Sequence, residues 1–196
     1  MDTKEEILDV ALDLFAGQGF HGTSIREIAE GVGIRKSSIY NHFKSKEDIL
    51  EQLFVSFGPG SIKKELKSKK LQSKLDQPYQ FLKTFADLTL KMMEDKREQK
   101  AIQIMFREHT NKTIRKKAKQ KFLEEDRMIV ADCFKQMMEQ GLIKDNDPLF
   151  LANEFIGPLA YTRIQYILLT LEEEPTEQMY SFLEQHIDFF WQAIKK

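Results

Sequence analysis

Glycine and proline are scarce in this 196-residue chain, which has 9 glycines and 5 prolines. Its apolar residues recur every three or four positions, and the alternating runs typical of strands are missing. A period of three to four residues places apolar side chains on one face of a helix. The sequence therefore predicts an all-α protein in which glycines mark the joints between helices.

The composition fits a globular protein and excludes several classes. The formal net charge is -1, so no global charge points to a nucleic acid or a membrane surface. Cys133 is the single cysteine, which excludes an internal disulfide framework and a cysteine-rich zinc site. No apolar run reaches the roughly 20 residues that span a membrane, and the acidic start is unlike a secretory signal. We expect a cytoplasmic protein with no membrane partner, no metal and no cofactor.

The spacing of caps and breakers predicts short helices first and longer ones later. We expect helices over residues 4–16, 24–30 and 36–43, and a fourth that begins at Ser45. A break follows at residues 57–60, and a basic connector covers residues 63–74. The longer helices are expected over 78–94, 96–109, 113–140, 148–171 and 176–194.

Residues 24–43 have the spacing of a helix-turn-helix. Ser24 and Glu27 predict a capping box at the start of the first helix, and Gly31 and Gly33 predict a tight turn before the second. The apolar residues of both helices can close a small core. That packing leaves a set of polar residues facing outward: Arg35, Lys36, Ser37, Ser38, Tyr40, Asn41 and His42.

The charge around this motif is asymmetric. Residues 31–46 carry four positive charges and no acid, whereas residues 1–30 hold seven acids and two bases. A basic face releases counterions when it meets phosphate, and small polar side chains allow a helix to reach base edges in the major groove. The pattern indicates DNA binding. The competing interpretation is a solvated helical end, in which Arg35 is only a surface charge and Tyr40 packs partly against Phe43.

Three stretches of the sequence resemble the N-terminal domain of TetR-family bacterial repressors. They are FAGQGFHGTSIREIA at 15–29, GVGI at 31–34 and IYNHFKSKEDIL at 39–50. The resemblance implies a homodimer with a helix-turn-helix DNA-binding domain over residues 1–50. It also implies a C-terminal helical ligand-binding and dimerisation domain over residues 51–196, in which 51–77 form a connector.

Carried over position by position, the resemblance implies a set of DNA contacts. Thr23, Ser24 and Lys46 are expected at phosphates, as are the side chains of Tyr40 and His42. Lys36, Ser37, Ser38, Tyr40 and Asn41 are expected at bases and the sugar-phosphate backbone. Arg35 stands where a small capping residue is common and could itself contact phosphate or base. Ser37 stands where glycine is frequent, so the base preference does not transfer.

The last two expected helices are apolar on more than one face. A helix of this kind must be covered on two sides, and a symmetry mate can cover the second. A large monomeric core is the alternative. The residues predicted for the dimer interface are Phe155, Leu159, Ile167, Phe182, Phe189 and Trp191.

The resemblance also implies a small-molecule cavity in the C-terminal domain. Methionine suits an adaptable apolar pocket, although it more often fills a core. The residues predicted to bind the ligand are Met93, Phe106, His109, Phe134, Met137 and Phe155. The basic run over 112–121 is expected to be a solvated face, with an entrance for an anionic ligand such as an acyl-CoA as the alternative.

Together these features predict a ligand-responsive homodimeric repressor. Its partners would be a near-palindromic double-stranded DNA operator and a small hydrophobic or amphipathic effector. The competing class is an all-helical enzyme that acts on a bound metabolite. The sequence offers that class no glycine-rich phosphate loop, no metal-ligand cluster and no histidine motif near Cys133, so we expect no enzymatic activity. A third possibility is a helical dimer that binds a partner without sensing a ligand.

Overall fold

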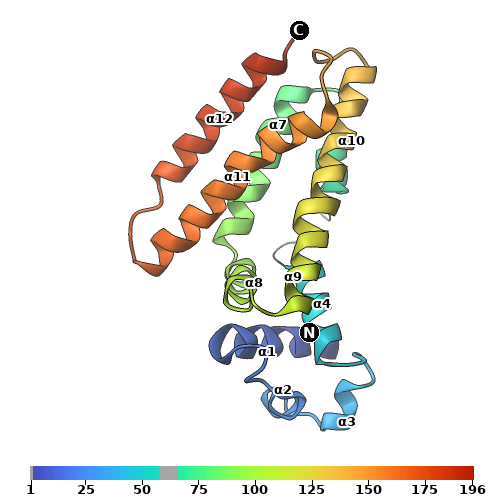
Figure 1. Cartoon of the computed structure of the whole chain (residues 1–196), viewed down its shortest axis with the longest axis vertical. Coiled ribbons are helices and arrows are strands. Elements are labelled where there is room, and N and C mark those ends of the chain that lie inside the picture. The colour runs from blue at the N-terminus through green and yellow to red at the C-terminus, as the bar shows by residue number, and fades with distance from the viewer. Residues whose placement is uncertain (1, 58–65) are drawn as a thin grey trace. The chain divides into compact units, whose positions relative to one another are not determined.

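A computed structural model describes residues 2–57 and 66–196, apart from the side chains at 113, 117, 118 and 121–123. These residues are helical, and they contain no strand beyond an isolated bridge between Ile143 and Lys195. Figure 1 shows the helices. Residue contacts divide the chain into two compact units, Met1–Ser61 with Lys96–Phe122 and Ile62–Asp95 with Leu123–Lys196. The all-α prediction is confirmed.

The first unit begins with four short helices. They are α1 Thr3–Gln18, α2 Ile25–Val32, α3 Lys36–Ile39 and α4 Lys46–Ser56. Polar side chains cap three of their N-termini, because Asp2, Ser24 and Ser45 each accept a hydrogen bond from a backbone N–H of the first turn. Gly33 follows α2 at φ 77°, a left-handed conformation that glycine adopts without steric cost.

Two helices from the middle of the sequence complete the first unit. They are α8 Lys96–Arg107 and α9 Lys112–Ala118. Ala101 and Ile104 of α8 and Ile114 of α9 are buried in the same apolar cluster as Ile7 and Phe15 of α1. The expected domain boundary at 50/51 remains a prediction, but the packing assigns α4, α8 and α9 to the N-terminal unit. Their apolar residues are needed to close its core.

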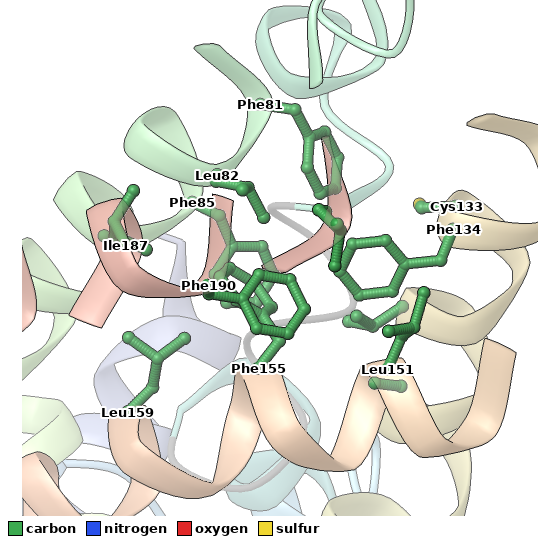
Figure 2. Packing of buried hydrophobic residues seen from close by; sticks show 14 of the residues in the cluster. Phe81, Leu82, Phe85, Cys133, Phe134, Leu151, Phe155, Leu159, Ile187 and Phe190 are labelled. Atoms are coloured by element: carbon green, nitrogen blue, oxygen red, sulfur yellow. The ribbon is translucent and has the colours of Figure 1, made fainter. Parts of the chain in front are cut away.

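The second unit is a bundle of four longer helices with one short one. The long helices are α7 Pro78–Glu94, α10 Asp126–Glu139, α11 Pro148–Leu171 and α12 Gln178–Ile194, and the short one is α6 Lys69–Gln72. Phe155 of α11 occupies the centre of the core. Its ring lies 5.1 Å from that of Phe85, 5.8 Å from Phe134 and 5.3 Å from Phe190, measured between centroids (Figure 2).

Several predicted helices are found with the expected bounds. The helices over 78–94 and 148–171 begin and end at the predicted residues. Each has proline in its first turn, where a backbone N–H would have no hydrogen-bond partner within the helix. The break after α4 also occurs, since the helix ends at Ser56. Residues 58–65 of the expected connector lie outside the described residues.

Other expected bounds are wrong. The helix expected over 36–43 ends at Ile39, and tighter turns continue through His42, whose N–H donates to the carbonyl of Ile39. The single helix expected over 113–140 is divided, because a π-helical turn over Lys119–Glu125 separates α9 from α10. The last helix begins at Gln178 rather than at residue 176.

Candidate nucleic-acid interface

The start of α2 is fixed by the predicted capping box. The Ser24 hydroxyl accepts from the N–H of Glu27 at 3.2 Å, and the Glu27 carboxylate accepts from the N–H of Ser24 at 2.7 Å. Hydrogen bonding of the Glu27 carboxylate with the side chain and the backbone N–H of Ser24 lowers the pKa of Glu27. At the other end, the N–H of Ile34 donates to the carbonyl of Ala29 at 2.9 Å. The angle between α2 and α3 is therefore set locally, and the helix-turn-helix is confirmed as a structural motif.

Helix α3 presents a row of polar side chains to solvent. Ile39 is fully buried and Phe43 nearly so, and these two residues anchor the segment to the first unit's core. Most of the predicted DNA-contacting residues are exposed: Arg35, Lys36, Ser37, Tyr40, Asn41 and His42. Ser38 is half-buried, and Tyr40 keeps 51% of its surface exposed. With half of its surface exposed, the Tyr40 ring is not part of the core and is available to contact a binding partner.

Arg35 occupies the N-cap position of α3 and makes no side-chain capping hydrogen bond. The guanidinium is consequently not committed to the helix terminus. It is exposed beside Lys36, so two positive side chains lie at the N-terminus of α3, where the helix dipole is also positive.

Thr23 lies in a different environment from its neighbours. It is only 2% exposed, and its hydroxyl donates to the carbonyl of Gly19 at 2.8 Å. The side chain therefore closes the loop between α1 and α2. Its burial gives no support to the predicted phosphate contact. Ser24 is exposed next to it, but its oxygen also caps α2.

Lys46 is a structural cation as well as a candidate phosphate ligand. Its ammonium donates to the carbonyls of Phe20 and Thr23 at 2.6 and 2.7 Å, and it lies 4.3 Å from the centre of the Phe20 ring. A lysine has three donors. The two carbonyls leave one N–H of the half-buried ammonium for another acceptor.

Four residues in the last turn of α1 and just after it are held by residues about ninety positions away, which sequence reasoning missed. Arg107 donates to the carbonyls of Ala16 and Gly17 at 3.1 and 2.6 Å, and Glu108 accepts from the N–H of Phe20 at 2.9 Å. Asn111 lies 3.2 Å from the ring nitrogen of His21. These contacts satisfy the open carbonyls at the end of α1. No local pattern signals them, since each residue reads as an ordinary surface residue in sequence.

Two ion pairs extend the same contact along α1. Arg97 lies 2.6 Å from Asp9, and Lys100 lies 2.6 Å from Asp13. The residues involved recur at three- and four-residue spacing on both helices. Helix α8 is thus attached to α1 along its length and to the loop that precedes α2.

The residues predicted to bind a ligand are divided between the two compact units, and the ligand site they were expected to form remains a prediction. Phe106 and His109 are exposed in the first unit, where Phe106 keeps 47% of its surface exposed. Met93, Phe134, Met137 and Phe155 lie in the second unit and are buried against other side chains. The rings of Phe134, Phe155 and Phe190 pack against one another (Figure 2). The sequence correctly marks apolar residues but cannot distinguish a cavity wall from a filled core.

The predicted dimer interface is also divided by the structure. Phe155 is fully buried and Leu159 is 2% exposed, and both belong to the bundle core. Ile167 is also buried within one protomer, with 7% of its surface exposed. Trp191 is half-buried, with its ring 5.8 Å from that of Tyr79. Phe182 and Phe189, by contrast, are exposed. Helix α11 is apolar on several faces, which is why its inward and outward residues could not be separated by pattern.

The described residues of the second unit line grooves at its surface. One, of about 370 Å³, lies between α7 and α12, and none of the predicted ligand residues lines it. Another, also about 370 Å³, lies beside Lys67, Glu125 and Met128.

The described residues contain few features of an enzyme. They hold no group of three or more His, Cys, Asp or Glu side chains able to bind a metal ion. Cys133 is buried, and burial raises its pKa to about 11, so the thiol stays protonated at neutral pH. No described helix is both long and apolar enough to cross a membrane.

Comparison with known proteins bears directly on this motif. Residues 7–53 match the family of "Bacterial regulatory proteins, tetR family". The HTH-type transcriptional regulator AcrR of Shigella flexneri is 45% identical over 53 residues, which is 27% of this chain and 25% of AcrR. The aligned part thus spans about a quarter of this curated relative.

Solved structures match over the rest of the chain as well. The SmeT–triclosan complex has a TM-score of 0.79 at 19% identity and covers 100% of this chain and 93% of SmeT. The regulator FadR of Bacillus subtilis, in complex with stearoyl-CoA, has a TM-score of 0.69 at 20% identity and covers 93% of this chain and 97% of FadR. These likenesses show a shared fold. The match over residues 7–53 shows that this part of the chain carries a helix-turn-helix like that of the tetR family of bacterial regulatory proteins.

Proposed function

We propose that the chain is a transcriptional repressor that binds double-stranded DNA through the exposed face of α3. The observation that carries the proposal is the exposed row on α3 and on the turns at its two ends, anchored by Ile39: Arg35, Lys36, Ser37, Tyr40 and Asn41. The cations supply phosphate affinity, and the hydroxyl and amide groups can hydrogen-bond base edges. The rigid turn at Gly33 holds this face in a fixed orientation relative to α2.

The repressor acts as a homodimer in this proposal. Helix α11 exposes a row at three- and four-residue spacing, Tyr161, Ile164, Leu168 and Leu171, and α12 exposes Phe182 and Phe189. Phe189 keeps 77% of its surface exposed, which is costly for an isolated protein in water. A second copy related by a two-fold axis covers the same patch on both protomers. A dimer of this kind carries two α3 helices and reads a near-palindromic operator.

A small hydrophobic or amphipathic effector is the third part of the proposal. Its support is the fold shared with SmeT, solved with triclosan, and with FadR, solved with stearoyl-CoA. The aromatic core around Phe155 is filled, so an effector that enters there must displace side chains. It would regulate DNA binding only if it binds one arrangement of the two reading helices more tightly than another.

Selection of bound sequences from random duplex DNA tests the proposal. The purified full chain is incubated with the library at a stated salt concentration, and the stoichiometry of the complex is measured on the best sequence. We expect enrichment of a two-fold symmetric site bound by two protomers. Failure to enrich any sequence at low and at moderate salt would contradict DNA reading, and enrichment of an asymmetric site bound by one protomer would contradict the dimer.

A further inference from the structure

The groove between α7 and α12 has the make-up of a ligand site. Its volume of about 370 Å³ is within the range of small-molecule pockets. Its floor is apolar and consists of Ala86 and Leu90 from α7 with Leu183 and Ile187 from α12. Leu183 and Ile187 are nearly fully buried, so the floor is continuous with the core and is firmly packed.

The rim of the groove is polar and its charge is unbalanced. Two carboxylates, Asp87 of α7 and Glu184 of α12, line it together with one cation, Lys83 of α7. The Lys83 ammonium lies 5.6 Å from the centre of the Tyr79 ring, with which it makes a cation–π contact. Within the described part of the chain, neither Asp87 nor Glu184 lies within ion-pair distance of a basic side chain. Two carboxylates above an apolar floor favour a bound cation with an apolar body.

Tyrosine–carboxylate hydrogen bonds join α7 to α12 on either side of the groove. The Tyr79 hydroxyl donates to Asp188 at 2.7 Å, and the Tyr180 hydroxyl donates to Glu94. The bond to Glu94 raises the pKa of Tyr180 to about 12, so its phenol is neutral at physiological pH. Tyr180 itself lines the groove. The two bonds hold the helices at a fixed separation, which gives a preformed site.

The groove stays open when the proposed dimer forms. Tyr180, Glu184 and Ile187 follow one another at four- and three-residue spacing along α12, whereas the exposed Phe182 and Phe189 are seven residues apart. With 3.6 residues per turn, the two sets point roughly 160° away from each other. A partner that covers Phe182 and Phe189 therefore leaves the groove in solvent.

We propose that this groove binds a small lipophilic monocation, with its positive charge at Asp87 and Glu184 and its apolar body on Leu90, Leu183 and Ile187. The site is a surface groove whose floor borders the core, and it lies on a different face of α12 from Phe189. It does not depend on DNA binding, so it is tested without an operator.

The probe is tetraphenylphosphonium, and tetraphenylborate is its control, because the two ions share shape and size but carry opposite charge. Binding to the full-length protein is measured by isothermal titration calorimetry at low salt. We expect saturable binding of the cation at one site per protomer, at least ten-fold tighter than binding of the anion. Equal affinity for the two ions, or no binding of the cation, would overturn the proposal.

Variants locate the site. Asp87→Asn combined with Glu184→Gln is expected to weaken cation binding at least ten-fold. The charge-matched control, Asp145→Asn with Glu139→Gln on exposed positions of the same unit, is expected to leave it unchanged. Leu90→Trp keeps both carboxylates but fills the half-buried floor and should also abolish binding. Thermal melting verifies that each variant is folded, and unaltered affinity in both groove variants would place the cation elsewhere.

Discussion

Glu108 accepts a hydrogen bond from the backbone N–H of Phe20 at 2.9 Å across 88 positions of the chain. The pair is buried at the loop that leads into α2. Arg107, the preceding residue, covers two carbonyls at the end of α1. The end of α8 thus holds the loop that positions the helix-turn-helix. A movement of α8 would therefore displace this loop.

Replacement of Glu108 by alanine is expected to destabilise the protein by about 2 kcal/mol, because it leaves the Phe20 N–H buried without an acceptor. Glu108→Gln keeps an acceptor oxygen and should lose less. The measurement is urea denaturation of both variants followed by circular dichroism. Equal losses in the two variants would show that the charge, and not the acceptor, matters at this position.

Lys46→Met removes two hydrogen bonds to the α1–α2 loop and one candidate phosphate contact. We expect a loss of roughly 1–3 kcal/mol in the free energy of unfolding. If the ammonium also contacts phosphate, the slope of log K against log salt falls by about one unit on any duplex. Lys44→Met, an exposed neighbour, tests general charge effects. A less stable variant with an unchanged salt slope would make Lys46 purely structural.

Phe189 and Phe190 are adjacent and have opposite environments, with 77% and 5% of their surfaces exposed. Phe190→Ala is expected to cost about 3–5 kcal/mol in stability, because it opens a cavity in the aromatic core. Phe189→Asp should instead shift the protein toward the monomer in analytical ultracentrifugation while its helical circular dichroism is retained. A dimer that survives Phe189→Asp would place the interface elsewhere.

His186 should make the protein less stable in mild acid. Burial lowers its pKa from the ordinary value, against the opposing effects of the hydrogen bond to the Phe155 carbonyl and the charge of Glu154. Since the unfolded chain binds the proton more readily, the stabilising contribution is complete above the unfolded pKa of about 6.5 and is lost as pH falls below it. His186→Gln should therefore lose less stability between about pH 7 and about pH 5 than the unmodified protein. His42→Gln, at an exposed position, serves as the control, and the same pH dependence in all three proteins would refute this role.

Features that depend on neighbouring residues could be predicted from the sequence. The Ser24–Glu27 capping box, the first-turn prolines of α7 and α11, and the exposed polar face of α3 follow from local hydrogen bonding and spacing. The hydrogen bond from the Phe20 N–H to Glu108 could not be predicted, because nothing in the sequence around a single glutamate indicates a partner 88 residues away. Phe155 and Phe189 read alike in sequence. Which of them faces the core is decided by how α7, α10 and α12 pack around α11.

The central claim, that α3 and the turn after it read bases, is tested most directly by Asn41→Ala on two duplexes. The affinities of this variant and of the unmodified protein are measured at one salt concentration for the selected operator and for a scrambled duplex of equal length. Asparagine can make a paired hydrogen bond to adenine, worth roughly 1–3 kcal/mol. The account predicts a loss of about five- to a hundred-fold on the operator and no change on the scrambled duplex. An equal loss on both duplexes, or no loss on either, would contradict it.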